Sequence, residues 1–359
     1  MIYLVILSIS ILLLFNVLLI ISLNRLFRPS KNETKLVNIS IVIAAKNESE
    51  NIDRLINSLK NLEYPSDLFE VIFVDDNSSD DTYELFKLKT ESLKNFSGKK
   101  LNDIGGSGKR EALSFGISCA KFPYILISDA DCIPQSNWLR SCSNKFSDNY
   151  DMIFGIAPFN KNKNIWNNIS CFENLRSTLF SFSMTAIGLP YTATARNFGF
   201  TKNAFDSLDG YSYTKDTLSG DDDLLLREGV KKKLKIGVET DSESFVYSES
   251  KKNFRDYFRQ RARHTQTAFH YLKRNQILLA LWHLTNLFFL FSPILMLLSP
   301  QLVILFPTKL IMDLIFVKAN QKKIGYSFST FEIFYLQFIY ELFLILHFFN
   351  ARFSKIKWK

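Results

Sequence analysis

The sequence has few cysteines, and none of them is arranged for a metal site or a disulfide framework. Only four occur in 359 residues, at positions 119, 132, 142 and 171, with no C-x-x-C spacing and no histidine nearby. This pattern disfavours zinc-binding modules and disulfide-stapled secreted domains, and it is typical of reduced thiols in a cytosolic compartment. No Ser or Cys has the neighbours of a covalent nucleophile either.

Charged side chains are missing from a long apolar stretch at the beginning of the chain. Residues 2–23 are long enough to cross a bilayer. No basic residue precedes them and no small-residue cleavage site follows, which disfavours a secretory signal peptide. We therefore expect a retained transmembrane anchor at 1–27. The basic residues that follow it place the next domain in the cytoplasm by the positive-inside rule: Arg25, Arg28, Lys31 and Lys35.

The C-terminal region 276–359 is again rich in apolar residues. Residues 277–298 and 300–317 are candidate crossings, and Lys309 can pair with Asp313 four residues later inside the bilayer. A third apolar segment, 328–349, is diluted by charged residues. Because a basic tail follows it (Arg352, Lys355, Lys357 and Lys359), three crossings would place that tail outside. We expect two full crossings, with the third segment re-entrant or in the membrane interface.

Between these ends the pattern predicts an α/β domain over 38–248. Apolar strands at 38–45, 68–74 and 124–127 alternate with helices, the first of which carries apolar residues at helical spacing over 52–59. This order is typical of a mostly parallel, Rossmann-like sheet covered by helices, which binds ligands beyond the carboxyl ends of its strands. Polar clusters at 46–48, 75–76 and 129–131 all fall at such ends.

The most informative cluster is the pair Asp129 and Asp131, at the end of an apolar strand. Residues two apart on a strand point the same way, so the two carboxylates repel unless a cation lies between them. Oxygen ligands of this kind suit Mg²⁺ or Mn²⁺ bound together with a substrate's phosphates. A solvated pair in the turn before Pro134 is the alternative for so short a pattern.

Two other stretches carry candidate site residues. Residues 105–110, G-G-S-G-K-R, run into a helix and resemble a phosphate cradle that includes Lys109. The spacing of a G-x-x-x-x-G-K-S/T loop is missing, which disfavours a nucleotide triphosphatase; a flexible linker remains the alternative for the glycines. Three adjacent acids, 221–223, open another helix. The helix dipole favours one or two acids there, but does not account well for three.

A basic, aromatic segment at 249–275 predicts an amphipathic interface helix, with an apolar face and a basic face. It can lie on anionic lipid headgroups, or its arginines can hold a pyrophosphate, and the two uses are compatible. The net charge of +9, concentrated around the apolar ends and this segment, likewise favours membrane lipids over nucleic acid as partner.

Taken in order, these blocks resemble the family-2 glycosyltransferases, inverting enzymes with a GT-A fold, over about residues 38–275. The blocks A-A-K-N-E-S-E, V-D-D-N-S-S-D-D-T, D-A-D, G-D-D-D-L-L-L-R and Q-R-A-R-H stand in the family's order. The resemblance implies a nucleotide-sugar site, a metal held by Asp131 and Asp129, a catalytic base at Asp221 or one place later at Asp222, and an acceptor pocket at Arg196 and Asn197. The implied nucleotide-sugar residues are Ala45, Asn47, Glu48, Asp76, Lys109, Asp129, Gln260 and Arg263.

Two positions depart from that pattern. Gly220 replaces the acid that normally precedes the base, and His264 replaces the tryptophan of the Q-x-x-R-W block. In the synthase-like branch of the family this tryptophan stacks on the acceptor sugar. The departures therefore disfavour processive polymer synthesis more than they disfavour sugar transfer.

The sequence thus predicts a membrane-anchored, metal-dependent inverting glycosyltransferase at the cytoplasmic face of the cell membrane. Its partners are expected to be a nucleotide-diphosphate sugar donor, a lipid-linked or glycan acceptor and membrane lipids, with no nucleic acid. A processive polysaccharide synthase is the alternative, and an inactive membrane scaffold that keeps the fold is a second one. A nucleotidyltransferase is disfavoured because no Gly-rich signature follows the first strand.

Overall fold

The structure, a computed structural model, describes residues 2–28, 35–214, 217 and 220–353 in two compact units. An α/β unit comprises 29–160 and 192–249, and a helical unit comprises 1–28, 161–191 and 250–359. Residues 161–191 thus group with the helical unit, although they lie inside the segment 38–248 predicted as one domain. Four of the basic residues used in the topology argument lie outside the described residues: Lys31, Lys355, Lys357 and Lys359.

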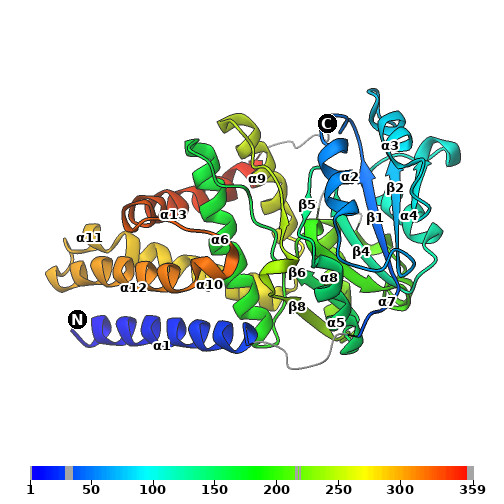
Figure 1. The fold of residues 1–359 in the computed structure, drawn as a ribbon. Coiled ribbons are helices and arrows are strands. Elements are labelled where there is room, and N and C mark those ends of the chain that lie inside the picture. The colour runs from blue at the N-terminus through cyan, green and yellow to red at the C-terminus, as the bar shows by residue number, and fades with distance from the viewer. Residues whose placement is uncertain (1, 29–34, 215–216, 218–219, 354–359) are drawn as a thin grey trace. The chain divides into compact units, whose positions relative to one another are not determined.

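The α/β unit is built on a seven-stranded sheet, and its mostly parallel character confirms the α/β part of the predicted fold class (Figure 1). The strand order is β3-β2-β1-β4-β7-β6-β8. The four strands from β3 to β4 run parallel, and β7 is antiparallel to both β4 and β6. Their bounds are β1 Ile39–Ala45, β2 Phe69–Asp75, β3 Phe96–Lys100, β4 Tyr124–Asp129, β6 Met152–Gly155, β7 Phe198–Thr201 and β8 Ile236–Glu239. A second, two-stranded sheet pairs β5 Ile133–Pro134 with β9 Val246–Tyr247.

The helices of this unit cover the sheet with apolar faces. In α2 the residues at helical spacing, Ile52, Leu55, Ile56 and Leu59, are all buried, as the sequence predicted. The α-helices are α2 Ile52–Lys60, α3 Thr82–Thr90, α4 Lys109–Cys119, α5 Trp138–Ser147, α7 Lys202–Ser207 and α8 Asp221–Lys231. Four 3₁₀ turns complete the unit: η1 Leu101–Ile104, η2 Ala195–Asn197, η3 Ser212–Thr214 and η4 Ser242–Ser244.

The register of the parallel strands decides where the polar clusters lie. Ala45 at the end of β1 pairs with Asp75 of β2, and Ala44 pairs with Asp129 of β4. The three strands therefore end at the same edge of the sheet, and the acids that follow them are brought to that edge.

The helical unit contains the elements from both ends of the chain. Its helices are α1 Ile2–Leu26, α6 Ile165–Ala186, α9 Phe254–Ala268, α10 Lys273–Leu290, α11 Ser292–Leu295, α12 Leu305–Asn320 and α13 Thr330–Phe353, with 3₁₀ turns η5 Pro300–Ile304 and η6 Gln321–Ile324. In Figure 1, α1, α10 and α12 lie side by side. Val5 and Leu12 of α1 form an apolar cluster with Phe289 of α10, Leu302 and Leu305.

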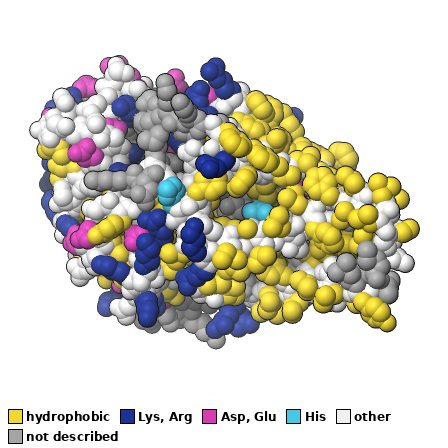
Figure 2. Space-filling view, turned by 180° about the vertical axis from the view of Figure 1, so that it is seen from behind, with side chains coloured by type: hydrophobic (Ala, Val, Ile, Leu, Met, Phe, Trp, Pro, Cys, Tyr) yellow, Lys and Arg dark blue, Asp and Glu magenta, His cyan; other side chains and the backbone are white. Residues whose placement is uncertain are grey.

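The outer surface of the helical unit is strongly apolar, and Figure 2 shows such side chains gathered over one side of the molecule. Residues exposed by more than half include Leu14, Ile21, Leu284, Leu297 and Phe331. Within the described residues, two helical stretches are long and apolar enough to cross a membrane, Val5–Leu26 and Thr330–Phe353. The predicted crossing 277–298 is not one continuous helix, because α10 ends at Leu290 and α11 begins at Ser292.

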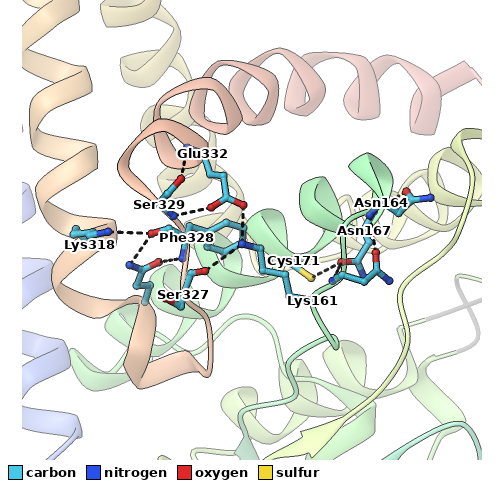
Figure 3. A network of polar contacts seen from close by, with 11 residues as sticks. Lys161, Asn164, Asn167, Cys171, Lys318, Ser327, Phe328, Ser329 and Glu332 are labelled. Carbon is cyan, nitrogen blue, oxygen red and sulfur yellow. Dashed lines mark hydrogen bonds and ion pairs between the residues drawn. The ribbon is translucent and has the colours of Figure 1, made fainter.

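Polar contacts fix the beginning of α13 (Figure 3). The Ser329 N–H donates to Glu332 Oε2 and the Glu332 N–H donates to Ser329 Oγ, so the two residues form a capping box. The Lys161 ammonium lies 2.7 Å from Glu332 Oε1 and over the buried ring of Phe328. The segment 327–332 is thereby attached to Lys161, in the stretch of chain that leads into α6.

Deeper in the unit, the predicted pair of Lys309 and Asp313 is present on α12. Arg176 of α6 also reaches Asp313, at 3.5 Å, and Lys309 lies 3.8 Å from Glu341 of α13. All four side chains are buried, and their charges balance as two cations and two anions.

Candidate active site

The loops after β1 and β2 hold each other at the carboxyl edge of the sheet. The Ser79 N–H donates to Asn47 Oδ1 at 2.8 Å, and the Glu48 N–H donates to Thr82 Oγ1 at 2.8 Å. Asn47 adopts a left-handed backbone with φ of 55°, which Asn tolerates better than most residues. Ala45 is buried, and its carbonyl accepts from the Asp76 N–H at 2.7 Å. The predicted nucleotide residues of these two loops therefore lie in one hydrogen-bonded assembly.

Asp76 connects that assembly to the glycine-rich loop. Its carboxylate is buried, and Oδ1 accepts from the Gly108 N–H at 2.7 Å. Gly108 has φ of 95°, a conformation that side chains rarely allow, and it directly precedes α4. The amide of the neighbouring Asn77 donates to the Gly106 carbonyl at 3.0 Å. The loop is thus held in place rather than being a free linker.

Lys109, the first residue of α4, joins two of the predicted acidic clusters. Its Nζ lies 2.7 Å from Asp129 Oδ1 and 3.8 Å from Asp221 Oδ2. Burial lowers the pKa of Lys109, but the charges of Asp129 and Asp221 outweigh burial and raise it above its ordinary value. Lys109 is therefore an ammonium ion that lies between the D-x-D pair and the start of α8.

The D-x-D pair fits a divalent cation. Ligand atoms of Asp129, Asp131 and Cys132 all lie within 4.8 Å of one another. Cys132 is fully buried, and burial raises the pKa of its thiol well above the ordinary value. The negative charges of Asp131 and Asp129 raise this pKa further. Because only the thiolate is a good ligand, the carboxylates are the ones suited to hold the ion, and carboxylate oxygens suit Mg²⁺ or Mn²⁺.

The three adjacent acids that open α8 point to different partners. Asp221 faces Lys109, as described above. Asp222 Oδ2 accepts from the Ala195 N–H at 2.6 Å, and Asp223 Oδ1 accepts from the Thr192 hydroxyl at 2.6 Å. Burial raises the pKa of Asp222 well above its ordinary value, and the charges of Asp223 and Asp221 raise it further.

The predicted acceptor residues Arg196 and Asn197 are placed differently from each other. The Arg196 guanidinium lies 4.3 Å from the centre of the Phe159 ring and donates to Ser248. Asn197 is buried: its amide nitrogen donates to the Ile156 and Ser244 carbonyls, both at 3.1 Å, and its oxygen accepts from the Trp138 indole. These bonds use both amide hydrogens and one lone pair of the oxygen, so the Asn197 side chain is held in the core.

Two predicted residues belong to the other unit. Gln260 and Arg263 lie on α9, and their role in binding the donor stays a prediction. On the same helix, Arg261 is used within the helical unit, since its Nε lies 2.7 Å from Glu173 Oε2. Glu173 Oε1 in turn lies 3.2 Å from His347 Nε2 on α13.

Thr192 and Asp223 were not among the site residues predicted from the sequence. No motif marks Thr192, whose hydroxyl matters only because the fold brings it to α8. Asp223 had one signal, the excess of acids at a helix start, but the pattern could not say which neighbour each acid would meet.

Comparison with known proteins identifies the family to which this arrangement belongs. Residues 40–207 match the profile of glycosyl transferase family 2, and residues 124–349 match that of glycosyl transferase family group 2. The chain belongs to this glycosyltransferase family. The resemblance read from the sequence motifs is thereby confirmed.

Individual relatives share only part of their length with this glycosyltransferase. Poly-β-1,6-N-acetyl-D-glucosamine synthase of Staphylococcus epidermidis is 34% identical over 110 residues, 31% of this chain and 26% of that protein. β-Monoglucosyldiacylglycerol synthase of Trichormus variabilis is 29% identical over 191 residues, 53% of this chain and 40% of that protein. The matched parts thus span well under half of these relatives.

A solved structure agrees with the fold along nearly the whole chain. The mannosyltransferase PcManGT from Pyrobaculum calidifontis, in complex with GDP-Man and Mn²⁺, superimposes with a TM-score of 0.60 over 99% of this chain and 98% of its own. The sequence identity is 15%, so this likeness concerns the fold alone.

Proposed function

We propose that this glycosyltransferase moves a sugar from a nucleotide-diphosphate donor to an acceptor hydroxyl, with inversion at the anomeric carbon and with the help of Mg²⁺ or Mn²⁺. The observation that carries the proposal is the position of Lys109, within 2.7 Å of Asp129 and 3.8 Å of Asp221. It brings a cation-binding pair and a candidate base to one place, which is what a single displacement between donor and acceptor requires.

Asp221 is the carboxylate best placed to act as the base. An alcohol is a poor nucleophile at neutral pH, so a carboxylate must take its proton as the new glycosidic bond forms. Asp222 and Asp223 already accept hydrogen bonds from the 192–195 segment, whereas Asp221 faces the Lys109 and Asp129 pair. With one base and no covalent nucleophile, attack from the face opposite the leaving diphosphate inverts the anomeric centre.

The diphosphate side is assigned to Lys109 and the D-x-D pair. A divalent ion held by Asp129 and Asp131 would supply positive charge to stabilise the departing diphosphate. Lys109 adds a fixed ammonium beside the same oxygens, and its contact with Asp129 keeps it oriented before the donor arrives. The assembly of Asn47, Glu48 and Asp76 is proposed to hold the nucleoside. PcManGT, which shares the fold, was solved with GDP-Man and Mn²⁺.

The acceptor is proposed to be lipid-linked or a growing glycan. The names of two relatives describe these two chemistries, a β-linked N-acetylglucosamine polymer and a glucosyl diacylglycerol. Arg196, whose guanidinium lies over the Phe159 ring, is the proposed acceptor contact, as predicted from the sequence. Asn197 is proposed to act only by positioning it.

The helical unit supports a membrane location. A bundle of α1, α10 and α12 with an apolar outer surface is suited to a bilayer, and the basic residues Arg25, Lys273 and Lys323 lie at helix ends or in the turn after α12. At the basic end of the bundle, Lys323 Nζ donates to Asn24 Oδ1 at 2.6 Å. At the opposite end, Val5 of α1 and Leu305 of α12 belong to one apolar cluster. We propose that α1 crosses the membrane, and that α10 with α11, and η5 with α12, form the two further predicted crossings although neither α10 nor α12 alone is long and apolar enough. The basic end and the α/β unit are proposed to be cytoplasmic.

The last apolar helix is proposed to lie in the membrane interface although its length would allow it to cross. α13 runs alongside the amphipathic helix α9: Tyr257 meets His347, and the Gln266 amide donates to the Ala351 carbonyl at 2.9 Å. Cysteine substitutions at Phe334 and Leu346, probed with a membrane-impermeant thiol reagent, test this; complete protection of both positions beside labelling at Arg352 would indicate a crossing.

The function is tested by a donor screen on the detergent-solubilised full chain with and without Mn²⁺, using UDP- and GDP-linked hexoses and N-acetylhexosamines. We expect transfer or hydrolysis of one donor, lost in Asp131→Asn and Asp221→Asn and retained in Asp53→Asn, an exposed acid on α2. No turnover of any donor together with no metal-dependent nucleotide binding would support the scaffold alternative. Products of many sugar units would support the processive synthase.

A further inference from the structure

The segment Thr192–Ala195 is attached to the start of α8 by three hydrogen bonds. Asp223 Oδ1 accepts from the Thr192 hydroxyl at 2.6 Å and from the Ala193 N–H at 2.9 Å. The Ala195 N–H donates to Asp222 Oδ2 at 2.6 Å. Two side chains of one helical turn therefore hold three donors of a segment about thirty residues earlier in the chain.

The hydrogen bonds of Asp223 to another segment differ from those that an acid at a helix start usually makes. A carboxylate in the first turn of a helix ordinarily serves the dipole and the unpaired N–H groups of that same turn. The Asp223 side chain instead directs one oxygen at two donors of another segment, and the side chain is buried, with 8% of the residue exposed. Hydrogen bonds to a buried carboxylate are among the stronger ones in proteins.

The attached segment leads directly to the proposed acceptor side of the site. Arg196 follows Ala195, and its carbonyl accepts from the Ser128 hydroxyl at 3.0 Å, next to Asp129. Asn197 then enters the core. The backbone around Arg196 is thus fixed at one end by Asp223 and at the other by Asn197, with the Asp221 carboxylate two residues before Asp223 on α8.

We propose that Asp223 is a positioning residue, which together with Thr192 holds the 192–195 segment so that an acceptor hydroxyl is presented to Asp221. This inference rests on the proposed function and deepens its acceptor side. It predicts that loss of the attachment lowers the rate of transfer to an acceptor far more than the rate of donor hydrolysis. Water is small and needs no binding site to be positioned for attack.

The experiment measures the ratio of sugar transferred to donor hydrolysed, with the full chain in detergent. The acceptor probes are dioleoylglycerol in mixed micelles and an N-acetylglucosamine trisaccharide. Because both rates scale with the amount of folded protein, their ratio is insensitive to partial unfolding. The ratio is expected to fall about tenfold or more in Asp223→Ala and Thr192→Val, since each removes a hydrogen bond to a charged group. Thr192→Ser keeps the hydroxyl and should stay within about twofold of the original ratio.

Asp151→Ala is the matched control. Asp151 Oδ2 accepts from the Lys235 N–H at 2.7 Å, so it also attaches one segment to another, but it does so beside β6 and β8. The ratio of sugar transferred to donor hydrolysed should not change in Asp151→Ala. Equal losses of transfer and hydrolysis in Asp223→Ala and in Thr192→Val would overturn the inference, because a merely structural role predicts that result.

Hydrogen exchange separates failure of this inference from failure of the proposed function. The amides of Ala193 and Ala195 should exchange faster in Asp223→Ala than in Asp151→Ala. If the original chain turns over no donor, the proposed function fails, and the exchange rates still report on the attachment. Unchanged exchange at both amides would refute the attachment itself.

Discussion

Asp221 and Asp222 differ by one position, and their replacement by asparagine is expected to have very different consequences. The Asp221 carboxylate lies 3.8 Å from the Lys109 ammonium and is the proposed base for the acceptor's proton. Asparagine cannot take up that proton. Loss of a general base costs about 10²- to 10⁴-fold in rate, or about 3 to 5 kcal/mol in the activation free energy. Asp221→Asn should therefore lower kcat by at least about a hundredfold.

Asp222→Asn should lower kcat only slightly, for two reasons. The amide oxygen can still accept from the Ala195 N–H, so the hydrogen bond is kept. Burial and the two neighbouring acids also raise the pKa of Asp222, so the charge that the substitution removes is already disfavoured. We expect a loss of less than about tenfold, or 1.4 kcal/mol.

The pH dependence of stability gives a second measure of Asp222. Its pKa is raised in the folded state, so the folded protein binds this proton more tightly than the unfolded chain does. The resulting stability is fully present below the unfolded pKa and is lost as the pH rises through the folded value. The melting temperature of the original chain should therefore fall as the pH rises through that value. In Asp222→Asn, which has no titrating carboxyl at this position, the melting temperature should fall less over the same pH range.

The assay compares initial rates of both variants with the donor found in the screen, at saturating Mn²⁺, with nucleotide binding as the control for an intact donor site. Full activity in Asp221→Asn together with loss in Asp222→Asn would refute the assignment of the base. Equal losses in both would refute the argument that Asp222 serves mainly the Ala195 N–H.

Three other changes test the remaining contacts. Asp131→Asn should abolish Mn²⁺-dependent binding of the nucleoside diphosphate in calorimetry, because the proposed metal site loses one of its two carboxylates. Glu173→Gln should lower stability in detergent by about 3 to 5 kcal/mol, since Arg261 and His347 lose a buried carboxylate. Asn197→Ala should cost about 3 kcal/mol by leaving the buried partners of its amide unpaired, and any loss of transfer should follow the loss of folded protein.

The first two of these changes have matched controls. Cys132→Ser should keep metal-dependent binding, since a protonated, buried thiol is a poor ligand. Arg259→Gln, at an exposed position of α9, should change stability by less than about 0.5 kcal/mol. Metal binding unchanged in Asp131→Asn, or equal stability of the Glu173 and Arg259 variants, would contradict the corresponding contact.

Local pattern was sufficient for most of the elements. The period of Ile52, Leu55, Ile56 and Leu59 predicted α2, and the apolar runs predicted β1, β2 and β4, because each depends on which residues a helix or strand must bury. Chain connectivity could not show that 161–191 leaves the α/β unit, since the apolar face of α6 would suit either a domain core or a helical bundle.

The sequence by itself determined that acids follow three parallel strands and that three more open a helix, because strand direction and alternation require only the local pattern. Which partner each acid meets was decided by the tertiary structure alone. Lys109 lies between Asp129 and Asp221, Thr192 reaches Asp223, and Asn197 enters the core, because segments far apart in the chain are packed together. No periodicity encodes such contacts, since they depend on how the whole sheet and its helices fit.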